Sequence, residues 1–187
     1  YHHGGSGAKI QSIFKGTPMK RLLTLLLVLM AGCQSGSSEP TPSATPDQPK
    51  EAPVVETVDQ DGQPVDLAKL YKEGPVVVYF YPKADTPGCT AQACSLRDAY
   101  QELTDKGVTV VGVSTDTPES QKAFKAKYHL PFILIPDTEK KVLDAFGVST
   151  IAGLSTRQAF LIKDGKIVWH DASASTDKQA QDVLKQL

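Results

Sequence analysis

Residues 76–98 have the sequence VVVYFYPKADTPGCTAQACSLRD, from which the fold class can be predicted. Its first part, Val76 to Tyr81, is a continuous apolar run, which predicts a strand that is buried on both faces of a sheet. From Leu96 onward apolar residues recur at helical spacing, and Gly107 ends the predicted helix. A buried strand that leads through a short loop into a helix is typical of α/β folds.

The sequence beyond this stretch continues the alternation of strands and helices. The predicted elements are a strand at 108–113, a helix from the Thr117-Pro118 cap to about Tyr128, a short strand at 133–135, a helix at 140–146, and a hairpin of 160–162 with 166–169 around Asp164-Gly165. Thr176 is predicted to cap a final helix that ends at Leu187. This order predicts an α/β, thioredoxin-like fold with a central mixed β-sheet flanked by helices.

The composition excludes several classes of protein. The chain has 187 residues, a net charge of −1 and 40% apolar residues, with no basic block of the kind that binds nucleic acid. It has three cysteines, Cys33, Cys89 and Cys94. They are too few for a disulfide scaffold, and their spacing does not suit a structural zinc site. We therefore expect neither metal nor organic cofactor.

The segment before the globular part has the organisation of a targeting sequence. Residues 1–18 precede the first methionine and are expected to be an upstream leader outside the mature protein. Residues 19–32 combine Lys20-Arg21 with an apolar run that is far shorter than the ~20 residues of a membrane span. The run ends in Ala31-Gly32-Cys33, which resembles a bacterial lipobox and implies cleavage before Cys33 and lipidation of its sulfur. An ordinary secretory signal with a chance cysteine is the alternative.

A tether and one domain complete the predicted organisation. Residues 33–52 are rich in Ser, Pro, Thr and Gly and are expected to form a flexible tether behind the lipidated Cys33. The domain is predicted at 53–187. A lipid anchor would place it in the cell envelope, facing the periplasm. Gln34 rather than Asp follows Cys33, which favours the outer membrane under the sorting rule of enteric bacteria.

The residues around Cys89 suit a reactive thiol. Cys89 is expected in the first turn of the helix after a buried strand, where free amide N–H groups and the positive end of the helix dipole favour a thiolate. Thr86 offers a hydroxyl nearby that can donate or accept a hydrogen bond. Pro82 and Pro87 stiffen the loop. Gln92 and Arg97, further along the helix, are expected on its surface.

The same stretch resembles the peroxiredoxin signature, in which a Pro is followed after three residues by Thr or Ser and after two more by Cys: here Pro82, Thr86 and Cys89. The longer run YFYPKADTPGCTAQACSLRD is similar to the peroxiredoxin Q branch, also called bacterioferritin comigratory protein. The resemblance extends over 53–187 and includes the stretches DQDG at 59–62, GVSTD at 112–116 and RQAFLI at 157–162.

The resemblance implies a role for each matching residue. Cys89 would be the nucleophile that reduces hydrogen peroxide and organic hydroperoxides, and Cys94 the thiol that resolves its sulfenic acid as an intramolecular disulfide. Thr86 would hydrogen-bond the peroxide, Arg157 would be the cation beside the thiolate, and Pro82 would shield the pocket. A thioredoxin-like protein would be the reductant, and the chain would be a monomer.

Three other functions compete with this interpretation. A lipid-anchored thiol–disulfide oxidoreductase of thioredoxin type needs two cysteines separated by two residues, whereas four separate Cys89 from Cys94. A copper-delivery protein of the same fold needs three residues between its cysteines and a well-placed His. An inactive binding module would not need Thr86 and Arg157 together with Cys89.

Overall fold

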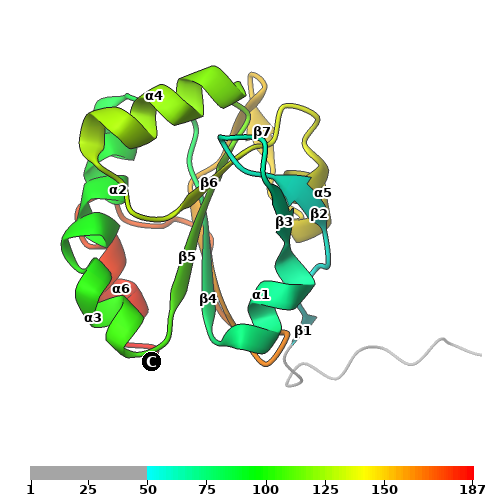
Figure 1. Cartoon of the computed structure of the whole chain (residues 1–187), viewed down its shortest axis with the longest axis vertical. Coiled ribbons are helices and arrows are strands. Elements are labelled where there is room, and N and C mark those ends of the chain that lie inside the picture. The colour runs from blue at the N-terminus through cyan, green and yellow to red at the C-terminus, as the bar shows by residue number, and fades with distance from the viewer. Residues whose placement is uncertain (1–49) are drawn as a thin grey trace, which may run out of the picture. The chain divides into compact units, whose positions relative to one another are not determined.

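The computed structural model describes residues 50–187. Figure 1 shows the strands at the centre and the helices on either side of them. The strands are β1 (Lys50–Glu51), β2 (Glu56–Val58), β3 (Pro64–Asp66), β4 (Val76–Phe80), β5 (Thr109–Ser114), β6 (Ile133–Pro136), β7 (Thr150–Ile151), β8 (Leu154–Ser155), β9 (Gln158–Lys163) and β10 (Lys166–Asp171). The helices are α1 (Leu67–Glu73), α2 (Pro87–Asp98), α3 (Tyr100–Asp105), α4 (Pro118–Tyr128), α5 (Lys141–Phe146) and α6 (Gln179–Leu184). In this part of the chain, no helix combines the length and the apolar character that crossing a bilayer requires.

The central sheet is mixed, as the sequence predicts. Its strand order is β1-β10-β9-β4-β5-β6. β4, β5 and β6 run parallel, whereas β9 pairs antiparallel with β4 and β10, and β1 pairs antiparallel with β10. The parallel half needs helical crossovers, which α2, α3 and α4 supply. The thioredoxin-like fold predicted from the sequence is confirmed.

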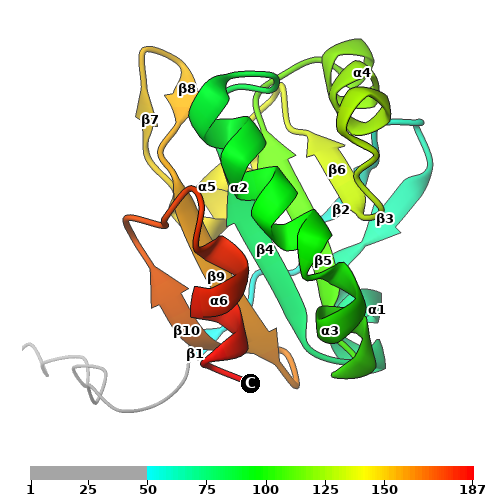
Figure 2. The ribbon, with the colours of Figure 1, turned by 90° about the vertical axis from the view of Figure 1, so that its left-hand side faces the viewer.

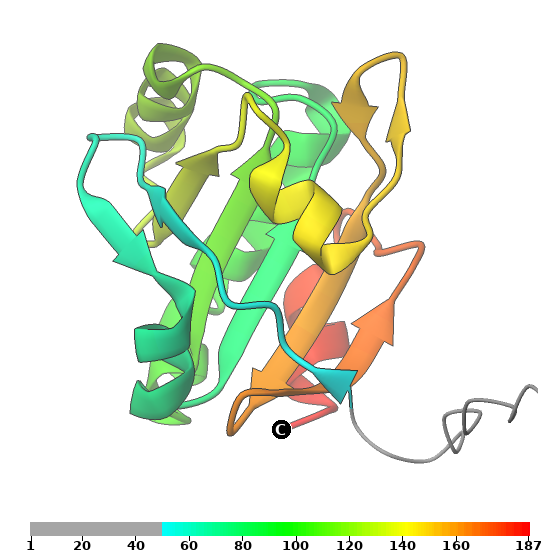
Figure 3. The same cartoon turned by 90° about the vertical axis from the view of Figure 1, so that its right-hand side faces the viewer.

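Both faces of the sheet are covered, which explains the continuous apolar run of β4. Val77, Tyr79 and Tyr81 belong to a core shared with α2, α3, α4 and α6. Figure 2 shows the face of the sheet that these helices cover. Val76, Val78 and Phe80 belong to a second core shared with α1, α5 and β3. Figure 3 shows the molecule from this side. A strand with both faces buried needs no polar alternation. β4 therefore lies at the centre of the domain, and the loop after it carries the cysteine motif.

Several local signals give the structure that they predict. The Thr117 hydroxyl accepts a hydrogen bond from Ser120 N at 3.3 Å and caps α4, with Pro118 as its first residue. Asp164 and Gly165 have φ angles of 52° and 74° between β9 and β10, the left-handed pair that a tight hairpin turn requires. These features depend on neighbours in sequence, so sequence alone suffices to predict them.

Three sequence predictions need correction. Lys50 and Glu51, which were assigned to the 33–52 tether, form β1 and pair with β10. Ala52, the last residue of that tether, donates from its N to Gly165 O at 2.7 Å. The final helix is α6, capped at Lys178 without a side-chain bond, so Thr176 does not cap it and Leu187 does not end it. The predicted leader, signal peptide and Cys33 lie outside the described residues. β1 escapes prediction because it is short and polar.

Candidate active site

The site lies where β4 leads into α2. Thr86 has an extended backbone and is the N-cap of α2, followed by Pro87, Gly88 and Cys89. Proline has no amide hydrogen, and the Thr86 side chain makes no cap bond. The amides of Gly88 and Cys89 therefore belong to the first turn, whose N–H groups have no partner within the helix. The Cys89 side chain is 1% exposed and shares the core under α2.

Arg157 brings a positive charge to Cys89. Its Nη2 donates to Cys89 Sγ at 3.4 Å, although 68 residues separate the two in sequence. Arg157 immediately precedes β9, which lies beside β4, so the sheet register sets the position of this side chain. A Cβ on Gly88 would lie 3.2 Å from Arg157 Nη2, so the absence of a side chain there leaves room for the guanidinium.

The structure corrects the prediction for Gln92 and adds a second glutamine. Gln92 is fully buried rather than on the helix surface. Its Oε1 accepts a hydrogen bond from Arg157 Nη1 at 2.6 Å, and its Nε2 donates to Gln179 Oε1 at 2.7 Å. Gln179 is the first residue of α6 and is also fully buried. Polar residues on a helix with few apolar neighbours give no sequence signal of burial, so neither contact was predictable.

Pro82 and Thr86 lie in the segment that joins β4 to α2. The Thr86 hydroxyl donates to Lys83 O at 2.9 Å. Because its one hydrogen is used there, its remaining lone pairs can only accept a hydrogen bond from a bound molecule. Pro82 is partly buried and directly follows Tyr81. Both residues thus lie between β4 and Cys89, which is in the first turn of α2, at the carboxyl end of β4, where open α/β folds form sites.

Cys94 shares α2 with Cys89 but does not bond to it. Both cysteines are free, Cys89 buried and Cys94 partly exposed. They lie five residues apart on one helix, which separates their Cα atoms by roughly 8.6 Å in ideal helix geometry. Disulfides need Cα atoms closer than about 7 Å. The two thiols therefore cannot join while α2 keeps its helical form.

Tyr79 contributes an unpaired hydroxyl to the core beneath α2. In residues 50–187, its hydroxyl and Gln179 Nε2 are the buried side-chain polar atoms without a hydrogen-bond partner. Burial raises the pKa of the Tyr79 phenol well above its ordinary value, and Tyr81 and both cysteines act in the same direction. Tyr79 therefore stays protonated near the two thiols. Nothing in the sequence distinguishes it from the other apolar residues of β4.

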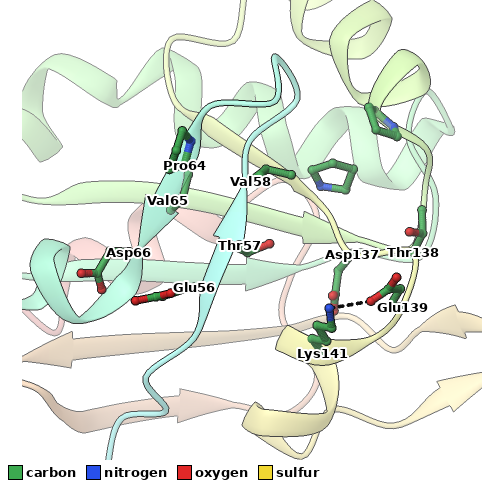
Figure 4. Close-up of a pocket in the computed structure, with 12 residues that line it drawn as sticks. Glu56, Thr57, Val58, Pro64, Val65, Asp66, Asp137, Thr138, Glu139 and Lys141 are labelled. Atoms are coloured by element: carbon green, nitrogen blue, oxygen red, sulfur yellow. Dashed lines mark ion pairs between the residues drawn. The ribbon is translucent and has the colours of Figure 1, made fainter.

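A separate groove opens on the other face of the sheet. It has a volume of about 680 Å³ and lies between the β2–β3 hairpin and the segment that joins β6 to α5 (Figure 4). Its rim carries the ion pair of Lys141 with Glu139, at 2.6 Å. Neither cysteine lines it. Since neither buried unpaired polar atom of residues 50–187 lines it either, we assign it no part in the chemistry.

Comparison with known proteins identifies relatives of this chain. The model of the AhpC/TSA family matches residues 49–170. A chloroplastic peroxiredoxin Q from Sedum lineare is 44% identical over 133 residues, which are 69% of this chain and 71% of the relative. Peroxiredoxin Bcp of Escherichia coli (strain K12) is 46% identical over 125 residues, which are 62% of this chain and 79% of the relative. Two other chloroplastic relatives are matched over 52–62% of their length.

A solved structure shows the same fold. The crystal structure of peroxidoxin BcpB from Mycobacterium tuberculosis superposes with a TM-score of 0.68 and 35% sequence identity, covering 74% of this chain and 96% of that one. The helix that carries the cysteines and the mixed sheet, except Asp171 at the end of β10, fall within the segment matched by the family model. The chain therefore belongs to the AhpC/TSA family and, within it, to the peroxiredoxin Q and Bcp group.

Proposed function

We propose that this protein is a thiol-dependent peroxidase that reduces hydrogen peroxide and organic hydroperoxides with the Cys89 thiolate. The observation that supports this most is the contact of Arg157 Nη2 with the buried Cys89 Sγ, at 3.4 Å, in the first turn of α2. A cation and a helix N-terminus both stabilise negative charge on sulfur. The site thus favours the form of cysteine that reacts.

The first step oxidises Cys89. The thiolate attacks one peroxide oxygen, the S–O bond forms and the O–O bond breaks. Sulfur is oxidised by two electrons to a sulfenic acid, and the departing oxygen leaves as hydroxide or alkoxide, which takes a proton from solvent. Negative charge moves from sulfur to that oxygen. Arg157 and the first-turn amides of α2 stabilise the charge along this path.

The loop before α2 orients the peroxide. Thr86 accepts a hydrogen bond from the peroxide O–H, since its own hydrogen is already donated to Lys83 O. Pro82 shields the thiolate from solvent. A fixed geometry of this kind lowers the entropic part of the barrier. Thr86→Val removes the acceptor with little change in volume and is expected to slow the reaction with peroxide.

The second step consumes the sulfenic acid. The Cys94 thiol attacks Cys89 Sγ, the S–S bond forms, the S–O bond breaks and the oxygen leaves as water. A dithiol of a thioredoxin-like protein then reduces the disulfide by thiol–disulfide exchange and is itself oxidised. We expect the protein to act as a monomer, because both thiols come from one helix.

Assays of three activities distinguish this function from its competitors. The reduced protein should consume hydrogen peroxide with dithiothreitol as the reductant. A thioredoxin-type oxidoreductase would instead reduce insulin, and a copper-delivery protein would bind Cu(I). Insulin reduction or copper binding without peroxide consumption would contradict the proposal.

Arg157→Ala should lower the second-order rate constant for peroxide by about 10²-fold, the effect of removing one charged donor from an oxyanion site. It should also move the midpoint of the pH-dependent alkylation of Cys89 to higher pH, because the thiolate loses its cation. Stopped-flow kinetics and iodoacetamide alkylation measure the two effects.

Arg97→Ala is the matched control for that experiment. Arg97 lies on α2, the helix that carries Cys89, and its Nη1 donates to Tyr128 O at 2.9 Å rather than to a cysteine. It should leave the alkylation midpoint of Cys89 close to that of the parent protein. An unchanged midpoint in Arg157→Ala would mean that Arg157 does not stabilise the thiolate.

We further propose that the mature protein begins at a lipidated Cys33 and is held at the cell envelope. The support is the lipobox-like sequence and the tether that follows it. Expressed in a bacterium from Met19, the protein should partition into the detergent phase of Triton X-114, whereas Cys33→Ala should remain in the aqueous phase. Membrane fractionation of Cys33→Ala equal to that of the parent protein would contradict the anchor.

A further inference from the structure

A buried hydrogen-bonded series connects α6 to the reactive sulfur. Its members, which we call the amide relay, are Arg157, Gln92 and Gln179. Arg157 Nη2 donates to Cys89 Sγ, Arg157 Nη1 donates to Gln92 Oε1, and Gln92 Nε2 donates to Gln179 Oε1. Both glutamines are 0% exposed. The series thus extends from the sulfur to a helix that no step of the proposed reaction has used.

The chemistry of its members gives the amide relay one direction. A guanidinium has donors and no acceptor, so Gln92 must present its oxygen to Arg157. With this oxygen turned to Arg157, the side chain of Gln92 points its NH₂ group at Gln179 of α6. Gln179 therefore accepts this hydrogen bond with its side-chain oxygen, and its own NH₂ group is left without a partner. The unpaired Gln179 Nε2 follows from the orientation that Arg157 imposes.

An unpaired buried donor is unfavourable and calls for a physical reason. Turning the Gln179 amide over would direct its NH₂ group at the NH₂ group of Gln92 and break the relay. The observed orientation therefore leaves the Gln179 NH₂ group unpaired, but it keeps the Gln92 oxygen directed at Arg157. Two hydrogen bonds separate Gln179 from the guanidinium that contacts Cys89. We therefore relate the unpaired donor to the orientation of Arg157 rather than to the packing of α6.

The start of α6 is itself fixed against α2. Ala180 N donates to Ser95 Oγ of α2 at 3.1 Å, beside the contact of Gln179 with Gln92. Val183, one turn further, is fully buried in the core shared with α2. Ala174 N donates to Arg157 O at 3.3 Å, which joins the segment before α6 to the backbone of Arg157. The Gln179 oxygen is thus held at a fixed place relative to α2.

We propose that Gln179 is a positioning residue of the peroxidase site: its side-chain oxygen orients the Gln92 amide, which in turn holds the Arg157 guanidinium against Cys89. The inference rests on the proposed function, in which Arg157 stabilises the Cys89 thiolate. It assigns a kinetic role to a residue that lies 90 positions after Cys89 in the sequence and does not contact the sulfur.

The first test is Gln179→Met, which keeps the length of the side chain and removes the acceptor. In this variant Gln92 Nε2 becomes the unpaired buried donor in place of Gln179 Nε2, so the number of unpaired donors stays the same. We therefore expect a midpoint of urea unfolding near that of the parent protein. The rate constant with peroxide should fall roughly threefold to tenfold, the effect of losing one hydrogen bond, and the alkylation midpoint of Cys89 should rise.

Val183→Ala is the matched structural control. It removes buried apolar atoms from the same helix and loosens its packing without touching the amide relay. It should lower the urea midpoint and leave the alkylation midpoint of Cys89 unchanged, the reverse of the pattern expected for Gln179→Met. If both variants change reactivity to the same degree, Gln179 acts through the docking of α6 and the inference is wrong.

A double-mutant cycle with Gln92→Glu tests the direction of the relay. A carboxylate has no donor, so it can accept from Arg157 without needing an acceptor at position 179. Gln179 can then turn its amide and donate to the carboxylate, so Gln179→Met should slow the parent protein by a larger factor than it slows the Gln92→Glu background. Equal effects in both backgrounds, or no effect in either, would overturn the inference. If the parent protein itself does not consume peroxide, the proposed function is wrong. The alkylation of Cys89 can still be measured in that case.

Discussion

Cys89→Ser is expected to abolish peroxide turnover, with a loss of at least about 10⁴-fold, because it removes the group that forms the covalent intermediate. A serine hydroxyl is essentially un-ionised at neutral pH, and Arg157 and the helix N-terminus cannot lower its pKa by enough to change that. The change in volume is small, so the fold should persist. Peroxide consumption measured with dithiothreitol in excess tests the result.

The outcome must be separated from a loss of structure. Far-ultraviolet circular dichroism and the urea midpoint of Cys89→Ser should stay near those of the parent protein, since Arg157 can still donate to the serine oxygen. A folded Cys89→Ser protein that continues to consume peroxide would remove Cys89 from the role of nucleophile. Cys94 would then be the remaining candidate in the described domain.

Cys94→Ser is expected to complete one reduction of peroxide and then stop. The first step should proceed within about twofold of the parent rate, because Cys94 lies far enough from Cys89 for the two sites to act independently. Without a second thiol, the sulfenic acid should persist and react with further peroxide to sulfinic acid. Trapping with dimedone after one equivalent of peroxide, followed by mass spectrometry, measures the two products. Continued turnover with a thioredoxin-like reductant would contradict the role of Cys94.

Disulfide formation also requires part of α2 to unfold. The ideal helical separation of the two Cα atoms, roughly 8.6 Å, exceeds the limit of about 7 Å for a disulfide. Opening α2 separates Arg157 from Cys89, Gln92 from Gln179, and Ser95 from Ala180 N. These contacts oppose the opening, so the sulfenic acid should live long enough for excess peroxide to compete with Cys94. Amide exchange in residues 89–96 should increase on oxidation.

The sequence predicted those parts of the molecule that depend on local signals. The apolar run of β4, the Thr117-Pro118 cap of α4 and the Asp164-Gly165 turn each give the predicted element. Cys89 in the first turn of α2 also follows from local sequence. Each feature is fixed by residues that are neighbours along the chain, and therefore needs no knowledge of the tertiary structure.

Other parts depend on contacts between distant segments. The position of Arg157 came from resemblance alone, because only the pairing of β9 with β4 brings it to Cys89. Gln92 was predicted on the surface because its burial depends on Arg157 and Gln179 supplying partners. Gln179 carries no sequence signal at all. Polar residues that are buried because distant partners satisfy them are the ones that a periodicity argument cannot find.

The disulfide between Cys89 and Cys94 can be detected within one tryptic peptide. Trypsin should release Ala84–Arg97 as a single peptide that contains Cys89 and Cys94 and no other cysteine. After one equivalent of hydrogen peroxide, we expect this peptide to resist alkylation and to have lost the mass of two hydrogens, the signature of a disulfide within it. A peptide that still carries two free thiols, or whose Cys89 is joined to a cysteine of another peptide, would show that Cys94 does not resolve the Cys89 sulfenic acid.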